Sequence, residues 1–201
     1  MQSGRRLIIR SQKRLFDDFF KIDEVILAHE RADGTMTGDE RRLVFERGDA
    51  VAVLLYNADT RSVVLVEQFR VPSLIGRRRD EPDTTNGWVT EVVAGMIDPS
   101  ETAEQAAVRE TLEETGYRIA DVVSIGKFFS SPGGASERIF LYFAKVSDAA
   151  RSGKGGGVGD EDVSIVRLSV EELFARLAQG LIEDAKLAIA AYWLRAHPEV
   201  Q

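Results

Sequence analysis

The sequence predicts a layered domain that mixes strands and helices, of the α/β or α+β class. Two continuous apolar runs of strand length, residues 50–56 and 63–66, are typical of strands covered on both faces. Segments with helical patterns alternate with further strand-like runs, and two of them begin with capping boxes. No internal repeat is visible, so one domain with a small appendage fits the 201 residues.

The strands are expected in two regions of the chain. Residues 1–45 are polar, with short β-like pieces and turn signals at 32–34 and 37–39, which indicate a small N-terminal β region. A charged, turn-rich stretch at residues 76–87 reads as a loop, and residues 130–134 are strand breakers. The strands expected after the N-terminal region are residues 50–56, 63–66, 88–94, 122–129 and 139–146.

Three helices are expected. The first runs from Thr102 to Gly116, because Thr102 and Gln105 form a capping box and Gly116 is placed to end it. The second runs from the capping box at residues 169–172 to about residue 179, before Gly180. The last covers about residues 183–196 and turns Leu187, Ala190 or Ala191, and Leu194 toward the core.

A glycine run, residues 152–159, resembles a phosphate cradle at first sight. It completes neither G-x-G-x-x-G nor the G-K-[ST] ending of a phosphate loop. We therefore expect a mobile loop with few contacts, and a direct phosphate role is the alternative.

Composition excludes several classes of protein. The 26 Lys and Arg against 33 Asp and Glu give a net charge of −7, which argues against a nucleic-acid binder. The absence of cysteine excludes disulfides, thiolate zinc sites and cysteine nucleophiles, and favours a reducing cytoplasm. The longest apolar run, residues 187–194, is far below the ~18 residues of a membrane span, and the apolar run near the N-terminus is too short for a signal peptide.

Serine hydrolase chemistry is also disfavoured. His29 and His197 lie far apart in the chain, and no serine lies within G-x-S-x-G. We expect both histidines at the surface, and both Trp88 and Trp193 in the core.

The first predicted helix carries three crowded carboxylates. Glu110 precedes Glu113 by three residues and Glu114 by four, so all three share about one turn. Like charges at these spacings destabilise a helix, and near its C-terminal end they gain nothing from the helix dipole. A solvated acidic surface is the ordinary interpretation of such a run. A hard divalent cation is the other, since Mg²⁺ and Mn²⁺ take clustered carboxylate oxygens as ligands.

The spacing around these glutamates favours the metal interpretation. The segment matches G-x5-E-x7-R-E-U-x-E-E-x-G-U, where U is a bulky apolar residue, at Gly95, Glu101, Arg109, Glu110, Glu113, Glu114, Gly116 and Tyr117. This pattern resembles the signature of the Nudix hydrolases. One position departs from it, since Thr111 occupies the first U site, beneath the helix.

The resemblance extends through most of the chain. The loop containing Pro132 is similar to that of the nucleotide-sugar branch, the ADP-ribose and GDP-mannose pyrophosphatases. Four further segments are most similar to bacterial GDP-mannose hydrolases: residues 47–49, 68–70, 155–162 and 184–186. The resemblance implies a Nudix-type α/β/α sandwich with a mixed sheet at residues 46–201. It also implies an N-terminal β region, residues 1–45, that is commonly exchanged between the two subunits of a homodimer.

The resemblance also implies roles for individual residues. Glu110, Glu114, Glu161 and the carbonyl of Ala94 would be metal ligands, with Mg²⁺ as the ion and Mn²⁺ as an alternative. Glu113 would help to hold the metal or order its water, Arg109 would orient the glutamates, and Glu101 would be structural. Glu161 would also assist the attacking water, although this chain has Gly159 where relatives often carry another acid, which leaves the base open.

Substrate contacts are implied for Arg70, Glu91, Ser131, Gly133 and Glu137. For Arg70 a surface ion pair is the alternative. A buried, unpaired Glu91 would be costly, which makes a plain core role for it unexpected.

The activity implied by the resemblance is metal-dependent hydrolysis of the pyrophosphate of a nucleoside diphosphate sugar. GDP-mannose, giving GMP and mannose 1-phosphate, is favoured over ADP-ribose, giving AMP and ribose 5-phosphate. An alternative of another class is a module that senses a nucleotide sugar without hydrolysing it. No nucleic acid or membrane partner is expected.

Overall fold

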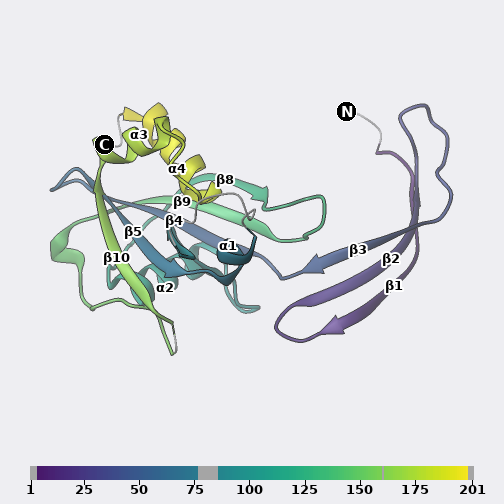
Figure 1. The fold of residues 1–201 in the computed structure, drawn as a ribbon, viewed down its shortest axis with the longest axis horizontal. Coiled ribbons are helices and arrows are strands. Elements are labelled where there is room, and N and C mark those ends of the chain that lie inside the picture. The colour runs from purple at the N-terminus through teal and green to yellow at the C-terminus, as the bar shows by residue number, and fades with distance from the viewer. Residues whose placement is uncertain (1–3, 77–85, 160, 199–201) are drawn as a thin grey trace. The chain divides into compact units, whose positions relative to one another are not determined.

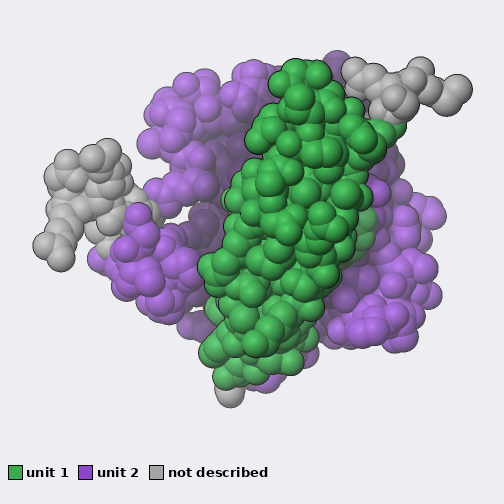
Figure 2. All heavy atoms as spheres, turned by 90° about the vertical axis from the view of Figure 1, so that its right-hand side faces the viewer, with its two compact units in different colours: residues 1–49, 128–138 green, residues 50–127, 139–201 purple. Residues whose placement is uncertain are grey.

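The computed structural model describes residues 4–76, 86–159 and 161–198. The chain divides into two compact units, residues 1–49 with 128–138, and residues 50–127 with 139–201 (Figure 2).

The first unit contains a three-stranded antiparallel sheet. Its order is β1 (Leu7–Asp17), β2 (Lys21–His29), β3 (Glu40–Glu46). Residues 128–138 join this unit, since the Phe45 N–H donates to the carbonyl of Gly134 at 2.8 Å and Ser136 Oγ lies 2.6 Å from Glu46. Every residue of β1 is exposed, including five large apolar side chains: Leu7, Ile8, Ile9, Leu15 and Phe16.

The second unit is built on a mixed sheet of order β10-β5-β4-β9-β8 (Figure 1). The strands on this path are β4 (Ala50–Asn57), β5 (Ser62–Phe69), β8 (Val123–Phe129), β9 (Arg138–Val146) and β10 (Val163–Ser169). β9 runs parallel to β4, while β5 pairs antiparallel with both β4 and β10. The sheet is therefore mixed, as predicted.

Helices cover both faces of this sheet. Helix α2 (Ala103–Thr115) contacts β4, β10 and the short strand β7 (Val93–Met96). Helix α3 (Val170–Ala178) contacts β5 and β10, and α4 (Ala185–Ala196) contacts β4. In Figure 1, α3 and α4 lie together on one side of the sheet and α2 lies on the other. This arrangement is the predicted α/β/α sandwich. None of the helices in the described part of the chain has the length and apolar character needed to span a membrane.

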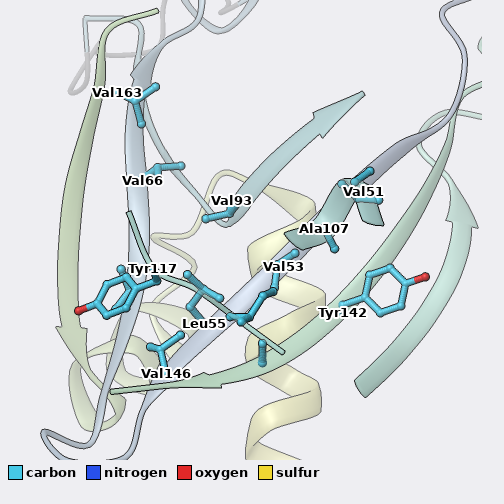
Figure 3. Close-up of a cluster of buried hydrophobic side chains, with 14 residues drawn as sticks. Val51, Val53, Leu55, Val66, Val93, Ala107, Tyr117, Tyr142, Val146 and Val163 are labelled. Carbon is cyan, nitrogen blue, oxygen red and sulfur yellow. The ribbon is translucent and has the colours of Figure 1, made fainter. Parts of the chain in front are cut away.

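The alternation along β4 explains its continuous apolar run. Val51, Val53 and Leu55 join a buried cluster with Ala107 of α2 and with Tyr117 (Figure 3). The intervening residues of β4 face the other layer. There the ring centroids of Tyr56 and Phe143 lie 6.3 Å apart, and those of Phe143 and Trp193 of α4 lie 5.2 Å apart. Because both faces are buried, both sets of side chains must be apolar.

The structure differs from the sequence prediction in several elements. The single strand expected at residues 88–94 is instead two short strands, β6 (Trp88–Glu91) paired with β5 and β7 (Val93–Met96) paired with β4. The chain changes its partner strand at Val92, which is fully buried. Helix α1 (Val71–Ile75) and edge strand β10 were not predicted, whereas the three longer helices were. The expected loop at residues 76–87 lies mostly outside the described residues.

Candidate functional site

Both ends of helix α2 are fixed by local interactions. Thr102 Oγ1 accepts the Gln105 N–H at 3.2 Å, and Gln105 Oε1 accepts the Thr102 N–H at 2.8 Å. At the other end Gly116 adopts φ +73°, a left-handed conformation that glycine adopts without strain, and donates to the carbonyl of Leu112 at 2.9 Å. The capping box and the glycine stop are confirmed.

Gly95 on β7 makes room for the carboxylate of Glu110. A Cβ atom at residue 95 would lie 2.0 Å from the carboxyl carbon of Glu110, closer than any van der Waals contact allows. β7 and α2 are in contact, so a side chain here would force the carboxylate away. Glycine is therefore needed at the start of the 23-residue motif because any side chain there would collide with Glu110.

Arg109 connects the acidic residues of the motif. Its Nε and Nη2 bind both oxygens of Glu101 at 2.8 and 2.9 Å, and Nη1 reaches Glu110 at 2.6 Å and Glu113 at 3.2 Å. Nη2 also donates to the carbonyl of Met96 at 3.0 Å. The hydrogen bond to Glu101 is the main reason that the pKa of Arg109 lies above its ordinary value. One guanidinium thus holds Glu101, Glu110 and Glu113, while the orienting role of Arg109 and the structural role of Glu101 stay predictions.

Glu114 is buried, with 3% of its surface exposed. Its two oxygens accept one hydrogen bond each, from Gln68 Nε2 at 3.1 Å and from the Ala94 N–H at 3.3 Å. Burial, together with the negative charges of Glu110 and Glu161, raises the pKa of Glu114 to about 8. Burial also raises the pKa of Glu110, against the opposing effect of Arg109.

Glu161 lies on the loop that follows the glycine run. Its Oε2 accepts the Val158 N–H at 3.0 Å, and its charge contributes to the raised pKa of both Glu110 and Glu114. The carboxylates of Glu110, Glu114 and Glu161 therefore lie near enough to repel one another, although Glu161 is far from the other two in the sequence. Over residues 4–76, 86–159 and 161–198, no three acidic or imidazole groups converge into a ready-made metal site, and Glu110 is turned to Arg109. The donor chemistry, an all-oxygen set of carboxylates that repel one another, fits a hard divalent ion.

The glycine run makes specific contacts, contrary to the sparse contacts expected of it. The N–H groups of Gly156 and Gly157 donate to the carbonyls of Glu114 and Glu113 at 2.9 and 3.1 Å. These are carbonyls at the end of α2, which lack partners within the helix. The run therefore caps helix α2.

Arg70 and Glu91 are hydrogen-bonded to each other, at 2.7 Å between Arg70 Nε and Glu91 Oε2. Lys186 Nζ binds the second oxygen of Glu91 at 3.0 Å and Asp184 at 2.7 Å. Burial favours the neutral form of Glu91, but attraction from Lys186 and Arg70 outweighs it and leaves the pKa of Glu91 below its ordinary value. The buried carboxylate is therefore paired. The side chain of Arg70 is 41% exposed and keeps an open face.

Ser131, Gly133 and Glu137 belong to the first unit. The carbonyl of Ser131 accepts the N–H groups of Gly134 and Ala135 at 3.0 and 2.8 Å, and Glu137 lies 3.7 Å from Arg47. Their contact with a substrate stays a prediction.

Three residues at the site were not predicted to belong to it: Gln68, Asp184 and Lys186. Gln68 is a buried polar residue on β5, at a position that alternates with the core residues Val64 and Val66. A polar residue in such a position is a usable signal, because burying an amide is costly unless it is hydrogen-bonded. Asp184 and Lys186 begin the last helix, where Asp184 accepts the N–H groups of Lys186 and Leu187, and the resemblance of residues 184–186 assigned no role to either side chain.

The chain is similar to known proteins along most of its length. Residues 46–190 match the NUDIX domain family. A GDP-mannose pyrophosphatase of Cronobacter sakazakii is 36% identical over 177 residues, which are 88% of each chain. Another, of Escherichia coli O1:K1 / APEC, is 31% identical over 95% of this chain and 96% of its own.

The fold also matches a solved structure, described as an ADP compounds hydrolase. The TM-score is 0.69 with 98% of both chains covered, and the sequence identity is 19%. The family match covers the carboxylate helix, the buried sheet and the glycine run together. The chain belongs to the NUDIX domain family and is a Nudix hydrolase.

Proposed function

We propose that this chain hydrolyses the pyrophosphate bond of GDP-mannose with the help of a divalent metal ion, releasing GMP and mannose 1-phosphate. The choice of substrate is supported by relatives named GDP-mannose pyrophosphatase that are 31–36% identical to the chain along most of its length. ADP-ribose is the second candidate, favoured by the similar fold of the ADP compounds hydrolase.

The observation that carries the metal requirement is the burial of the Glu114 carboxyl group beside Glu110 and Glu161. Burial and two neighbouring glutamates raise the pKa of this carboxyl to about 8, so its ionised form is unfavourable in the folded protein. A bound cation would offset that cost. Glu110, Glu114, Glu161 and the carbonyl of Ala94 would hold Mg²⁺, or Mn²⁺, at this position. A pure nucleotide-sugar sensor would have no need for self-repelling glutamates.

The ion would neutralise the phosphate oxygens and lower the pKa of a bound water. The side chains of this protein supply the remaining steps. Arg109 holds Glu110 and Glu113 in place. Glu113 would help to hold the ion or to order its water, and Glu161 would accept a proton from that water if it comes within about 3 Å. Arg70, Glu91, Ser131, Gly133 and Glu137 would contact the substrate.

We further propose that the N-terminal β region, residues 1–45, is exchanged between the subunits of a homodimer and that residues 46–201 form the Nudix domain. The exposed apolar side chains of β1 support this assembly, since such a surface gains stability when it is covered. The lack of cysteine supports a cytoplasmic location.

The test is a side-by-side assay of GDP-mannose and ADP-ribose with Mg²⁺, with both products identified. We expect GDP-mannose to give the higher kcat/KM, and EDTA to abolish turnover. Inertness toward both substrates would refute the assignment. Calorimetry that shows tight binding of GDP-mannose without product over hours would favour the sensor instead.

A further inference from the structure

The glycine run holds the end of helix α2 and the carboxylate of Glu161 together. Three successive N–H groups make the contacts. Those of Gly156 and Gly157 donate to the carbonyls of Glu114 and Glu113, at 2.9 and 3.1 Å. The N–H of Val158 then donates to Glu161 Oε2 at 3.0 Å. The backbone of residues 156–158 is thereby bound both to the end of helix α2 and to the side chain of Glu161.

Only glycine permits this close approach. At Gly155, where φ is +70°, a Cβ would lie 2.4 Å from the carbonyl oxygen of Glu114 and 2.7 Å from Cα of Thr115, which are backbone atoms that cannot turn aside. At Gly157, where φ is +82°, a Cβ would lie 2.6 Å from Oε2 of Glu161. A side chain at residue 155 would push the loop off the helix, and one at residue 157 would push Glu161 off the loop.

We propose that Gly155, Gly156 and Gly157 are positioning residues, which hold the loop that carries Glu161 against the end of helix α2, on the side of Glu110 and Glu114, before any ligand binds. The inference rests on the proposed function, because Glu161 is the carboxylate which that function needs beside the helix. Ordering Glu161 in advance removes the entropy that a free loop would lose at each turnover. The glycines therefore act on the reaction through Glu161 and never touch the substrate.

The chain offers a matched control for this proposal. Gly180, after helix α3, has the same φ of +70°, but within the described residues a Cβ there would meet nothing within 4 Å. Gly155→Ala and Gly180→Ala therefore impose the same backbone strain, and only the first adds a collision with α2. The two variants separate loop position from general stability.

The experiment measures two quantities in the full-length protein. The first is the dissociation constant of Mn²⁺ alone, from the electron paramagnetic resonance signal of free Mn²⁺. The second is kcat and KM for GDP-mannose with Mg²⁺. We expect Gly155→Ala to weaken Mn²⁺ binding and to lower kcat by about tenfold or more, the range seen when residues that orient metal ligands are changed. Gly180→Ala is expected to stay within about twofold of the wild type, since its strain affects stability alone.

Equal Mn²⁺ affinities for the two variants would overturn the proposal. Should Gly155→Ala fail to fold by circular dichroism, Gly157→Ala takes its place, because its Cβ meets the side chain of Glu161 and leaves the backbone of α2 untouched. An unchanged Mn²⁺ affinity in a folded Gly157→Ala would refute the proposal in the same way. A wild-type protein that neither binds Mn²⁺ nor cleaves GDP-mannose would instead refute the proposed function, so the two failures are distinguishable.

Discussion

Replacing Glu114 by glutamine removes a buried carboxyl group that can gain or lose a proton, with little change of shape. Burial and the neighbouring glutamates raise the pKa of Glu114 from 4.5 to about 8 in the folded protein. Between these values the folded protein holds a proton that the unfolded chain has lost. The stability contributed by that proton is complete below about pH 4.5 and is lost as the pH rises through about 8.

The magnitude follows from this interval. Each pH unit is worth about 1.4 kcal/mol, so the free energy of unfolding of the metal-free protein falls by up to about 5 kcal/mol from pH 4.5 to 8. Between pH 5.5 and 7.5 the expected fall is about 3 kcal/mol. Glu114→Gln has no such proton to lose, so this contribution to the pH dependence of its unfolding free energy should be absent.

The assay is urea unfolding at several pH values in EDTA, repeated with Mn²⁺. We expect Mn²⁺ at a hundred times its dissociation constant to stabilise the wild type by about 2.7 kcal/mol and Glu114→Gln by much less. Glu171→Gln, at a side chain on α3 that is 72% exposed, is the control for exchanging a carboxylate for an amide. Parallel pH profiles for the wild type and Glu114→Gln would refute the reasoning.

Three further predictions test the surroundings of this carboxylate. Gly95→Ala should expel the carboxylate of Glu110, which lies 2.0 Å from the new Cβ, and lower kcat by about tenfold or more, as measured by product release from GDP-mannose. Gln68→Leu removes the donor at 3.1 Å from Glu114 and should weaken Mn²⁺ binding by about tenfold in a resonance titration. Thr111→Val removes a buried hydroxyl that has no hydrogen-bond partner among the described residues, and should raise the free energy of unfolding by about 1 kcal/mol in urea.

Each of these expectations has a definite contrary result. A Gly95→Ala enzyme with wild-type kcat would show that Glu110 does not need its present position. Unchanged Mn²⁺ affinity in Gln68→Leu would mean that the amide does not orient Glu114. A loss of stability in Thr111→Val would show that the hydroxyl is bonded after all. Gly126→Ala, at a glycine without positive φ where a Cβ would meet nothing within 4 Å among the described residues, serves as the folding control for the Gly95 variant.

The sequence by itself determined the carboxylate helix. Caps act between residues three apart, and Glu110, Glu113 and Glu114 share a turn through helical periodicity alone, so both features are local. The continuous apolar runs likewise predicted strands buried on both faces, which β4 and β5 are. The change of partner strand at Val92 escaped prediction, because a strand pattern reports burial and carries no information on which neighbour it pairs with.

The tertiary structure decided how distant residues complete the site. Gln68 reaches Glu114 across 46 positions of sequence, and Lys186 reaches Glu91 across 95. The sequence predicted few contacts for the glycine run, because a glycine-rich composition is typical of flexible linkers. In the folded chain the missing Cβ atoms allow the loop backbone to approach the end of α2. The physical reason is that a local pattern encodes the conformation of a segment, whereas the atoms next to that segment are known only when the chain has packed.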